Sequence, residues 1–249
     1  MFLFTFKDTG GFRQKTGLLK NFYKYLAGLL VVLAGCGDDE TKVTSDADYF
    51  PLHKGFYQIY NVSETRYLNI NDSESRTFQL KTEVVDSFIN QEGGYTYTIH
   101  RSERTTPSDP WTFTEVWAVR MNTANVVVSE ENVPYIRIAF PAVKNRTWDG
   151  NALNTLSADE YVLTTVGKSY QLESGEQVGP YIQIVQEDSG DPITFVDKRQ
   201  EFYVKNIGLV KQEVTDIKYC SDADDCVPGT QVINNGIIYV QTLIEYGQN

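Results

Sequence analysis

Histidine and cysteine, the side chains that most often bind zinc, are scarce in this sequence of 249 residues. There are two histidines, His53 and His100, so histidine alone cannot supply the three ligands of a catalytic zinc ion. The catalytic motifs HExxH, GxSxG and SxxK and the glycine-rich phosphate loop do not occur. The sequence therefore predicts neither a metal centre nor a cofactor, and it indicates no catalytic residue.

Clusters of lysine and arginine are missing as well. The chain has 22 basic and 33 acidic residues, which gives a formal net charge of −11. Proteins that bind nucleic acid or adhere to anionic lipid surfaces need clustered positive charge. We therefore expect no nucleic-acid partner.

Helical periodicity is absent from residues 49–249, where no window of about 11–18 residues repeats its apolar positions with a helical period. Short alternating runs occur instead, such as 78–85 and 95–101 on either side of the turn at 91–94. Asn234-Asn235-Gly236, between two β-branched runs, predicts a further hairpin. Because strand follows strand, we expect residues 49–249 to form an all-β fold, a single antiparallel domain shaped as a barrel, a curved half-barrel or a sandwich.

The first 35 residues have the parts of a removable secretory leader. Basic residues occur up to Lys24, and an apolar run of about ten residues follows. This run is too short to span a bilayer, since a membrane helix needs about 20 apolar residues. The leader holds five bases and one acid, so its removal leaves 214 residues with 17 bases, 32 acids and a net charge of −15.

The leader ends in Leu33-Ala34-Gly35-Cys36, which resembles the lipobox of bacterial lipoproteins. The resemblance implies cleavage before Cys36, a diacylglyceryl group on its thiol and acylation of the new amino terminus, for example by palmitate. Two or more acyl chains hold a protein on a membrane stably, whereas one chain binds only marginally. The alternative interpretation is an ordinary secretory signal that happens to precede a cysteine.

Acidic residues follow the predicted lipidation site directly, in Gly37-Asp38-Asp39-Glu40. This cluster resembles the surface-export signal of lipoproteins from Bacteroidota. It implies an outer-membrane lipoprotein that faces the cell surface rather than the periplasm. The alternative is a solvated tether of the kind that any lipoprotein can carry, and we interpret residues 36–48 as such a flexible acidic tether in either case.

Three segments of the β domain resemble an uncharacterised class of β-rich lipoproteins from Bacteroidota. They are YFPLHKG at 49–55, FP at 140–141 with KNRTWDGN at 144–151, and EFYVKNIGLV at 201–210. The class usually has tryptophan where this chain has Gln58, so the first segment departs from the pattern. The resemblance implies location and fold, and no activity comes with it.

Cys220 and Cys226 remain as a pair after Cys36 is assigned to the lipid. Two cysteines in an exported protein usually form a disulfide. The enclosed loop is short, so we expect the bond to stabilise the fold by roughly 2 kcal/mol. Its three aspartates do not match the spacing of a calcium-binding EF-hand loop.

The three tryptophans, Trp111, Trp117 and Trp148, are the candidate side chains for stacking on a ligand. Trp148 lies near a turn, where it would either close one end of a barrel or offer a platform to a sugar ring; we favour the first. Aspartate and glutamate are abundant, but nothing in the sequence selects one pair as the acid and base of a glycosidase.

Two functions remain open at this point. The first is a membrane-anchored envelope lipoprotein whose β domain binds a glycan, lipid or protein ligand without catalysis, or has a structural role. The second is a carboxylate-dependent hydrolase that acts on envelope or environmental glycans. The first fits better, because the chain combines abundant tyrosine with no catalytic motif.

The anchor can be tested by the substitution Cys36→Ala. Loss of the thiol removes the attachment point of the acyl chains, so we expect the protein to move from the membrane fraction to the soluble fraction after cell lysis. Immunoblotting of the two fractions is the measurement. A variant that stays with the membrane contradicts the lipidation.

Overall fold

The computed structural model describes residues 45–91, 93–221 and 226–249. The predicted leader, the lipobox and most of the tether lie outside the described residues. The described chain begins with a short 3-10 helix, η1 (Asp46–Tyr49), and continues into twelve strands. Within these described ranges, no helix is long and apolar enough to cross a membrane.

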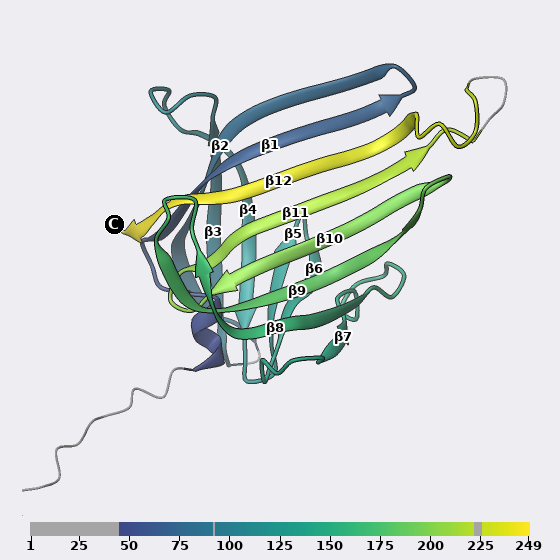
Figure 1. Ribbon diagram of the computed structural model, residues 1–249. Coiled ribbons are helices and arrows are strands. Elements are labelled where there is room, and N and C mark those ends of the chain that lie inside the picture. Colours follow the sequence, from purple (N-terminus) through teal and green to yellow (C-terminus); the bar gives the residue numbers. More distant parts are fainter. Residues whose placement is uncertain (1–44, 92, 222–225) are drawn as a thin grey trace, which may run out of the picture. The chain divides into compact units, whose positions relative to one another are not determined.

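The strands alternate with short turns along the whole domain (Figure 1). They are β1 (Phe56–Asn69), β2 (Asp72–Ile89), β3 (Tyr95–Arg104), β4 (Thr112–Met121), β5 (Asn125–Glu130), β6 (Val133–Ala139), β7 (Thr147–Asp149), β8 (Glu160–Gln171), β9 (Gln177–Asp191), β10 (Phe195–Val204), β11 (Gly208–Tyr219) and β12 (Ile233–Gln248).

All twelve strands belong to one antiparallel sheet, in the order β6-β5-β4-β3-β2-β1-β12-β11-β10-β9-β8-β7. Strands that follow each other in sequence pair with each other, except β6 and β7, and β12 pairs with β1. The sheet curls into a nearly closed barrel, with β6 and β7 as its two edges. This architecture confirms the predicted all-β, single antiparallel fold.

The two edge strands meet at a seam. The backbone N–H of Ile136 in β6 donates to the carbonyl of Gly150, at 2.9 Å. The indole N–H of Trp148 in β7 donates to the carbonyl of Ile136, also at 2.9 Å, and its ring packs edge-to-face on Tyr161. Trp148 therefore joins the edges and packs against the core.

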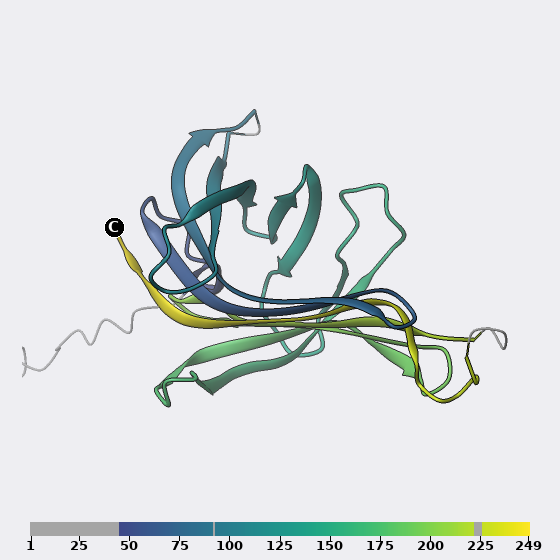
Figure 2. The same ribbon diagram turned by 90° about the horizontal axis from the view of Figure 1, so that it is seen from above.

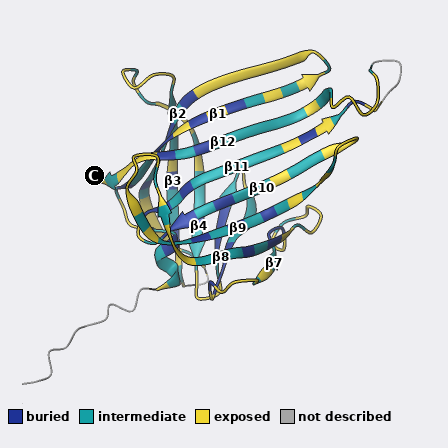
Figure 3. Ribbon diagram, in the orientation of Figure 1, coloured by how far each residue is buried: buried dark blue, intermediate teal, exposed yellow. Residues whose placement is uncertain are grey.

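The six strands β1, β2 and β9–β12 extend beyond the curled part as a long slab (Figure 2). Buried residues gather where this slab passes the wall of β3–β6, whereas the tips of the hairpins are exposed (Figure 3). Two apolar clusters form the core. The larger one includes Val119, Ile138, Leu163 and Ile184, and the second centres on Tyr60, Leu80, Val204 and Val210.

The hairpin predicted at Asn234-Asn235-Gly236 is wrong, because these residues lie inside β12, where Asn235 and Gly236 pair with β11. Gly236 has φ +135°, and a Cβ atom there would come within 2.2 Å of the carbonyl oxygen of Asp216. Glycine is needed because two backbones approach closely, which is the other common reason for glycine in a strand. The hairpin predicted around residues 91–94 is confirmed between β2 and β3.

A disulfide joins Cys220 and Cys226 in the connection between β11 and β12, with 6.3 Å between their Cα atoms. The cysteine pair expected from the sequence is therefore oxidised. The bond closes a loop at the end of the long strands, whereas η1 lies at the opposite end of the slab (Figure 1).

The seam can be tested with Gly150→Ala. A Cβ atom at this position would lie 2.4 Å from the Tyr161 ring, so the ring or the backbone that bonds Ile136 must move. We expect the substitution to lower the free energy of unfolding by about 1–3 kcal/mol, measured by chemical denaturation. Gly94→Ala is the control, because its Cβ would meet no atom closer than 3.7 Å. Equal stabilities of the two variants would contradict the packing at the seam.

Candidate binding site inside the sheet

A cavity of about 70 Å³ lies between the walls of the sheet. Its lining comes from β1–β6 on one side and from β10–β12 on the other, so the curling of the sheet creates it. Phe56, Val84 and Ile99 supply apolar surface. Among these apolar residues lie several charged side chains, which is unusual for a protein interior.

Arg137 is the central charge of this site. It lies on β6 between the buried residues Ile136 and Ile138, and its side chain is 12% exposed. Its guanidinium binds Glu130 of β5 through Nε, at 3.1 Å, and through Nη2. It also donates to Glu201 of β10 on the facing wall, at 3.3 Å. One arginine therefore links two carboxylates on opposite sides of the cavity.

Glu201 accepts hydrogen bonds from three neighbouring side chains. Its Oε1 accepts from Arg137 and from the Gln212 amide at 3.1 Å, and its Oε2 accepts from the Tyr203 hydroxyl at 2.7 Å. All three neighbours donate, which matches a carboxylate, because both of its oxygens accept hydrogen bonds. The residue itself is 2% exposed.

The charges of the cluster also determine the protonation of their neighbours. Burial alone would lower the pKa of Arg137, but Glu130 and Glu201 outweigh it and hold the pKa above the ordinary arginine value. Burial, reinforced by the negative charge of Glu201, raises the pKa of Tyr203 well above the ordinary tyrosine value. Arg137 is therefore positive and Tyr203 neutral over the physiological pH range.

Trp117 and Arg101 form a second polar group on the cavity wall. The guanidinium carbon of Arg101 lies 3.7 Å from the centroid of the Trp117 ring, a cation–π contact. The indole N–H of Trp117 is buried, and no group in the described part of the chain accepts it. The Nε–H of Arg101 also lacks a hydrogen bond: Glu115 is 3.0 Å away as an ion-pair partner, but it is not aligned to accept.

Gln58 occupies the position where the resembling lipoproteins usually have tryptophan. Its amide donates to the carbonyls of Ile207 and Leu209, at 2.7 and 2.8 Å. It lies against Gly208, which has φ +86°. Gln58 therefore fixes the turn between β10 and β11 to β1, and its donors are already used.

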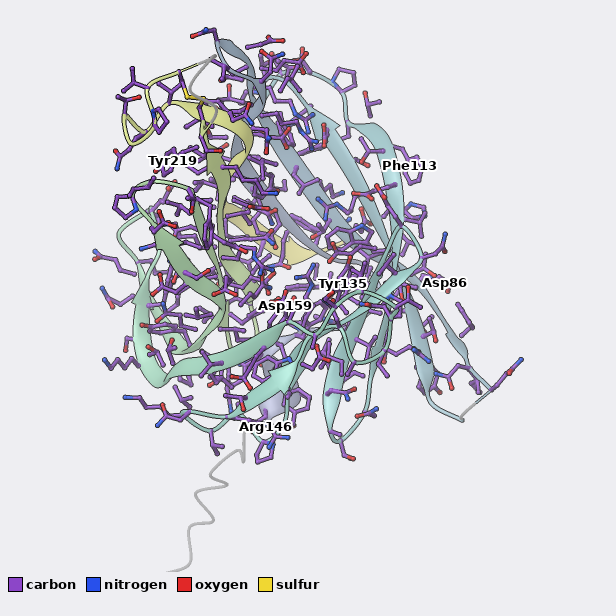
Figure 4. The ribbon with its side chains drawn as sticks, turned by 90° about the vertical axis from the view of Figure 1, so that its right-hand side faces the viewer. Asp86, Phe113, Tyr135, Arg146, Asp159 and Tyr219 are labelled. Carbon is purple, nitrogen blue, oxygen red and sulfur yellow. A yellow bond between two sulfur atoms is a disulfide. The ribbon has the colours of Figure 1, made fainter. Side chains whose placement is uncertain are left out.

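A further ion-pair cluster lies on β10, outside the lining of the cavity. Arg199 of β10 binds Asp159 at 2.8 Å and Asp197 at 2.8 Å. Figure 4 shows Asp159 and Tyr135 near the centre of the view, between the two walls of the sheet. Tyr135 also lies under Arg137, with the guanidinium carbon 5.0 Å from the ring centroid.

Only one of the three candidate tryptophans lines the cavity, namely Trp117. Trp148 belongs to the seam, and Trp111 packs under Arg104, whose guanidinium carbon is 4.2 Å from its ring centroid. The structure does not bring the three tryptophans together into one platform. In the described ranges, no group of three or more histidine, cysteine or acidic side chains could hold a metal ion.

Sequence reasoning missed Arg137, Glu130 and Glu201. The available signal was Arg137 itself, a charged residue inside the apolar run of residues 135–140. A charge in such a strand needs a buried partner, but the sequence does not show which carboxylate provides it. Glu201 lay within one of the resembling segments, where no role was assigned to it.

Comparisons with known proteins found solved structures of low similarity to this chain. No family model matches the chain, and no curated protein matches it. A solved structure from Bacteroides fragilis, described as an exported protein with a YmcC-like fold, aligns with a TM-score of 0.44 and 12% identity. One from Parabacteroides distasonis, described as a lipoprotein, aligns with a TM-score of 0.42 and 13% identity. Each alignment covers 80% of this chain and 98% of the other.

The buried tyrosines of the interior predict that the fold loses stability at alkaline pH. Burial raises the pKa of Tyr60, Tyr161 and Tyr203 in the folded state above the value of 10.0 expected when unfolded. Below pH 10 these phenols are protonated in both states; above it the unfolded chain loses protons first. We therefore expect the free energy of unfolding to fall as the pH rises above about 10.

The measurement is ultraviolet absorbance of phenolate during alkaline titration, with the denatured chain as reference. We expect a subset of the 16 tyrosines to ionise only when the fold is lost. Titration of all tyrosines in one step, with the protein still folded, would contradict the buried positions.

Proposed function

We propose that this chain is an envelope lipoprotein, held on the outer membrane through acyl chains on Cys36 and facing the cell surface. The lipobox and the acidic residues after it support this location. The β domain, in this proposal, is a non-enzymatic binding module that presents the cavity inside its sheet.

One observation carries the binding role: the buried indole N–H of Trp117, a residue of the cavity wall, has no acceptor among the described residues. A buried donor without a partner costs about 1–3 kcal/mol, so natural proteins seldom leave one in place. Arg101 Nε, on the same wall, has an ion-pair partner in Glu115 but no aligned hydrogen bond. A ligand oxygen that accepts from the indole N–H would remove the cost of the unpaired donor.

The dimensions and chemistry favour one part of a glycan as the bound group. A water molecule needs about 10–15 Å³ of such space, so the cavity of about 70 Å³ admits several waters or one small group. A hydroxymethyl or acetamido group of a sugar has this size and supplies an acceptor oxygen. A lipid chain fits less well, because Arg101, Arg137, Glu130 and Glu201 all line the space.

The same geometry argues against the hydrolase alternative. Glycosidases need one protonated and one ionised carboxyl group at the scissile bond. Here Arg137 binds both Glu130 and Glu201, and Glu201 accepts two further hydrogen bonds. Both carboxylates are therefore held by donors of this chain rather than directed at a bound glycosidic oxygen.

The binding role predicts a specific loss in Trp117→Phe. Phenylalanine keeps an aromatic ring over Arg101 but removes the indole N–H, so we expect saccharide affinity to fall by about 5–20-fold, the value of one hydrogen bond. The measurement is calorimetric titration with a panel of neutral and N-acetylated disaccharides.

Trp111→Phe is the matched control, because Trp111 also packs under an arginine but lies outside the cavity. We expect its affinities to equal those of the unmodified protein. If Trp117→Phe and Trp111→Phe bind equally well, or if no saccharide binds the unmodified protein, the glycan proposal is wrong.

A further inference from the structure

A second feature of the domain is a set of exposed apolar side chains at the β2–β3 hairpin. Ile89 is 69% exposed, Phe88 55% and Tyr95 53%. Ile89 and Tyr95 lie opposite each other in the pairing of β2 with β3. Large apolar side chains exposed together on one hairpin mark a surface that contacts something other than water.

This hairpin lies at the end of the domain where the described chain begins. Tyr95 lines an open groove together with Asp46 of η1, Met121 at the end of β4 and Pro141 after β6. The groove measures about 920 Å³. Val143, 50% exposed, belongs to the same β6–β7 connection, which is tied to η1 by the hydrogen bond from Ala142 N to Asp46 at 2.8 Å. We call Phe88, Ile89, Tyr95 and Val143 the apolar rim.

Exposure alone does not select this rim. Ile193 is 54% exposed and belongs to the turn between β9 and β10, and this turn forms a distant tip of the slab (Figure 1). The two places differ in their relation to the predicted anchor, since the described chain starts at Ser45 beside the rim and Cys36 precedes it by nine residues.

The length of chain between the two residues limits where an anchored domain can go. Nine residues span at most about 30 Å when fully extended. Strand β12 alone has 16 residues, and a strand of that length covers about 50 Å. The end with η1 therefore stays near the bilayer, and the opposite tips cannot reach it unless the domain lies flat.

We propose that the apolar rim rests on the bilayer surface and inserts Ile89, Phe88 and Tyr95 into its interfacial region. This inference rests on the proposed lipid anchor at Cys36. Tyrosine and apolar residues together suit the boundary between headgroups and acyl chains. The rim side chains are uncharged, and one charge of each sign, Asp46 and Lys144, lies near them, so the attraction that we propose is apolar and does not require anionic lipid. The rim would fix the orientation of the domain, with the long strands directed away from the membrane.

The test uses the full lipidated protein in phosphatidylcholine vesicles that contain brominated lipid. A fluorescent thiol label is placed by Ile89→Cys or, as the matched control, by Ile193→Cys. Cys220 and Cys226 are joined in a disulfide and Cys36 carries lipid, so the introduced thiol is the one that reacts. We expect quenching by the brominated lipid to be several-fold stronger at position 89 than at position 193.

A second label site, Tyr95→Cys, controls for the possibility that Ile89→Cys disturbs the hairpin. We expect the label at position 95 to be quenched as strongly as the label at position 89. Mass spectrometry of the same preparation reports the lipid on Cys36. If the lipid is present and all three labels are quenched equally weakly, the rim does not touch the bilayer and the inference is wrong, while the anchor stands. The fluorescence emission of the rim labels can instead shift with protein density and without quenching by the lipid. That result means that a second copy or another protein covers the rim, and it also overturns the inference. An unmodified Cys36 overturns the anchor and the inference together.

Discussion

The pairing of β1 with β12 is the constraint on which the rest of this structure depends. It joins the two ends of the strand sequence, from Phe56 opposite Gln248 to Tyr67 opposite Gly236. Because β6 and β7 do not pair with each other, this pairing alone joins the strands β1–β6 to the strands β7–β12 in one sheet. It also turns the wall of β3–β6 toward β10 and β11, which is how Arg137 meets Glu201 across the interior.

The buried charges inside the sheet are better understood as a source of specificity than of stability. Replacing a buried ion pair by apolar side chains of similar volume is often neutral or stabilising, because the charges lose their hydration. Removing one partner alone is costly, because it leaves an uncompensated charge. Arg137, Glu130 and Glu201 therefore join the two walls of the interior, and they keep a polar surface on the cavity that Trp117 also lines.

Much of the fold could be predicted from the sequence, because alternation of apolar and polar residues is a local property. It identified the β2–β3 hairpin and the antiparallel, all-β architecture. It failed at Asn235-Gly236, where a turn signal lies within a strand that pairs closely with β11. It also failed at the interior site, since Arg137 and Glu201 are 64 residues apart and only the tertiary pairing brings them together. The disulfide could be predicted because two cysteines allow one pairing.

The position of β12 has a consequence for the order of folding. Tyr57 in β1 and Glu245 in β12 are 188 residues apart, yet their side chains are bonded at 2.9 Å. Contacts of such long range form late, because closing a long loop costs conformational entropy before any contact compensates for it. During synthesis, β1–β6 and β7–β11 can each form a meander by themselves, but the interior between them does not exist until the last strand inserts. The final strand, of 16 residues, thus joins the two meanders into one sheet, and the polar interior is assembled in that last step.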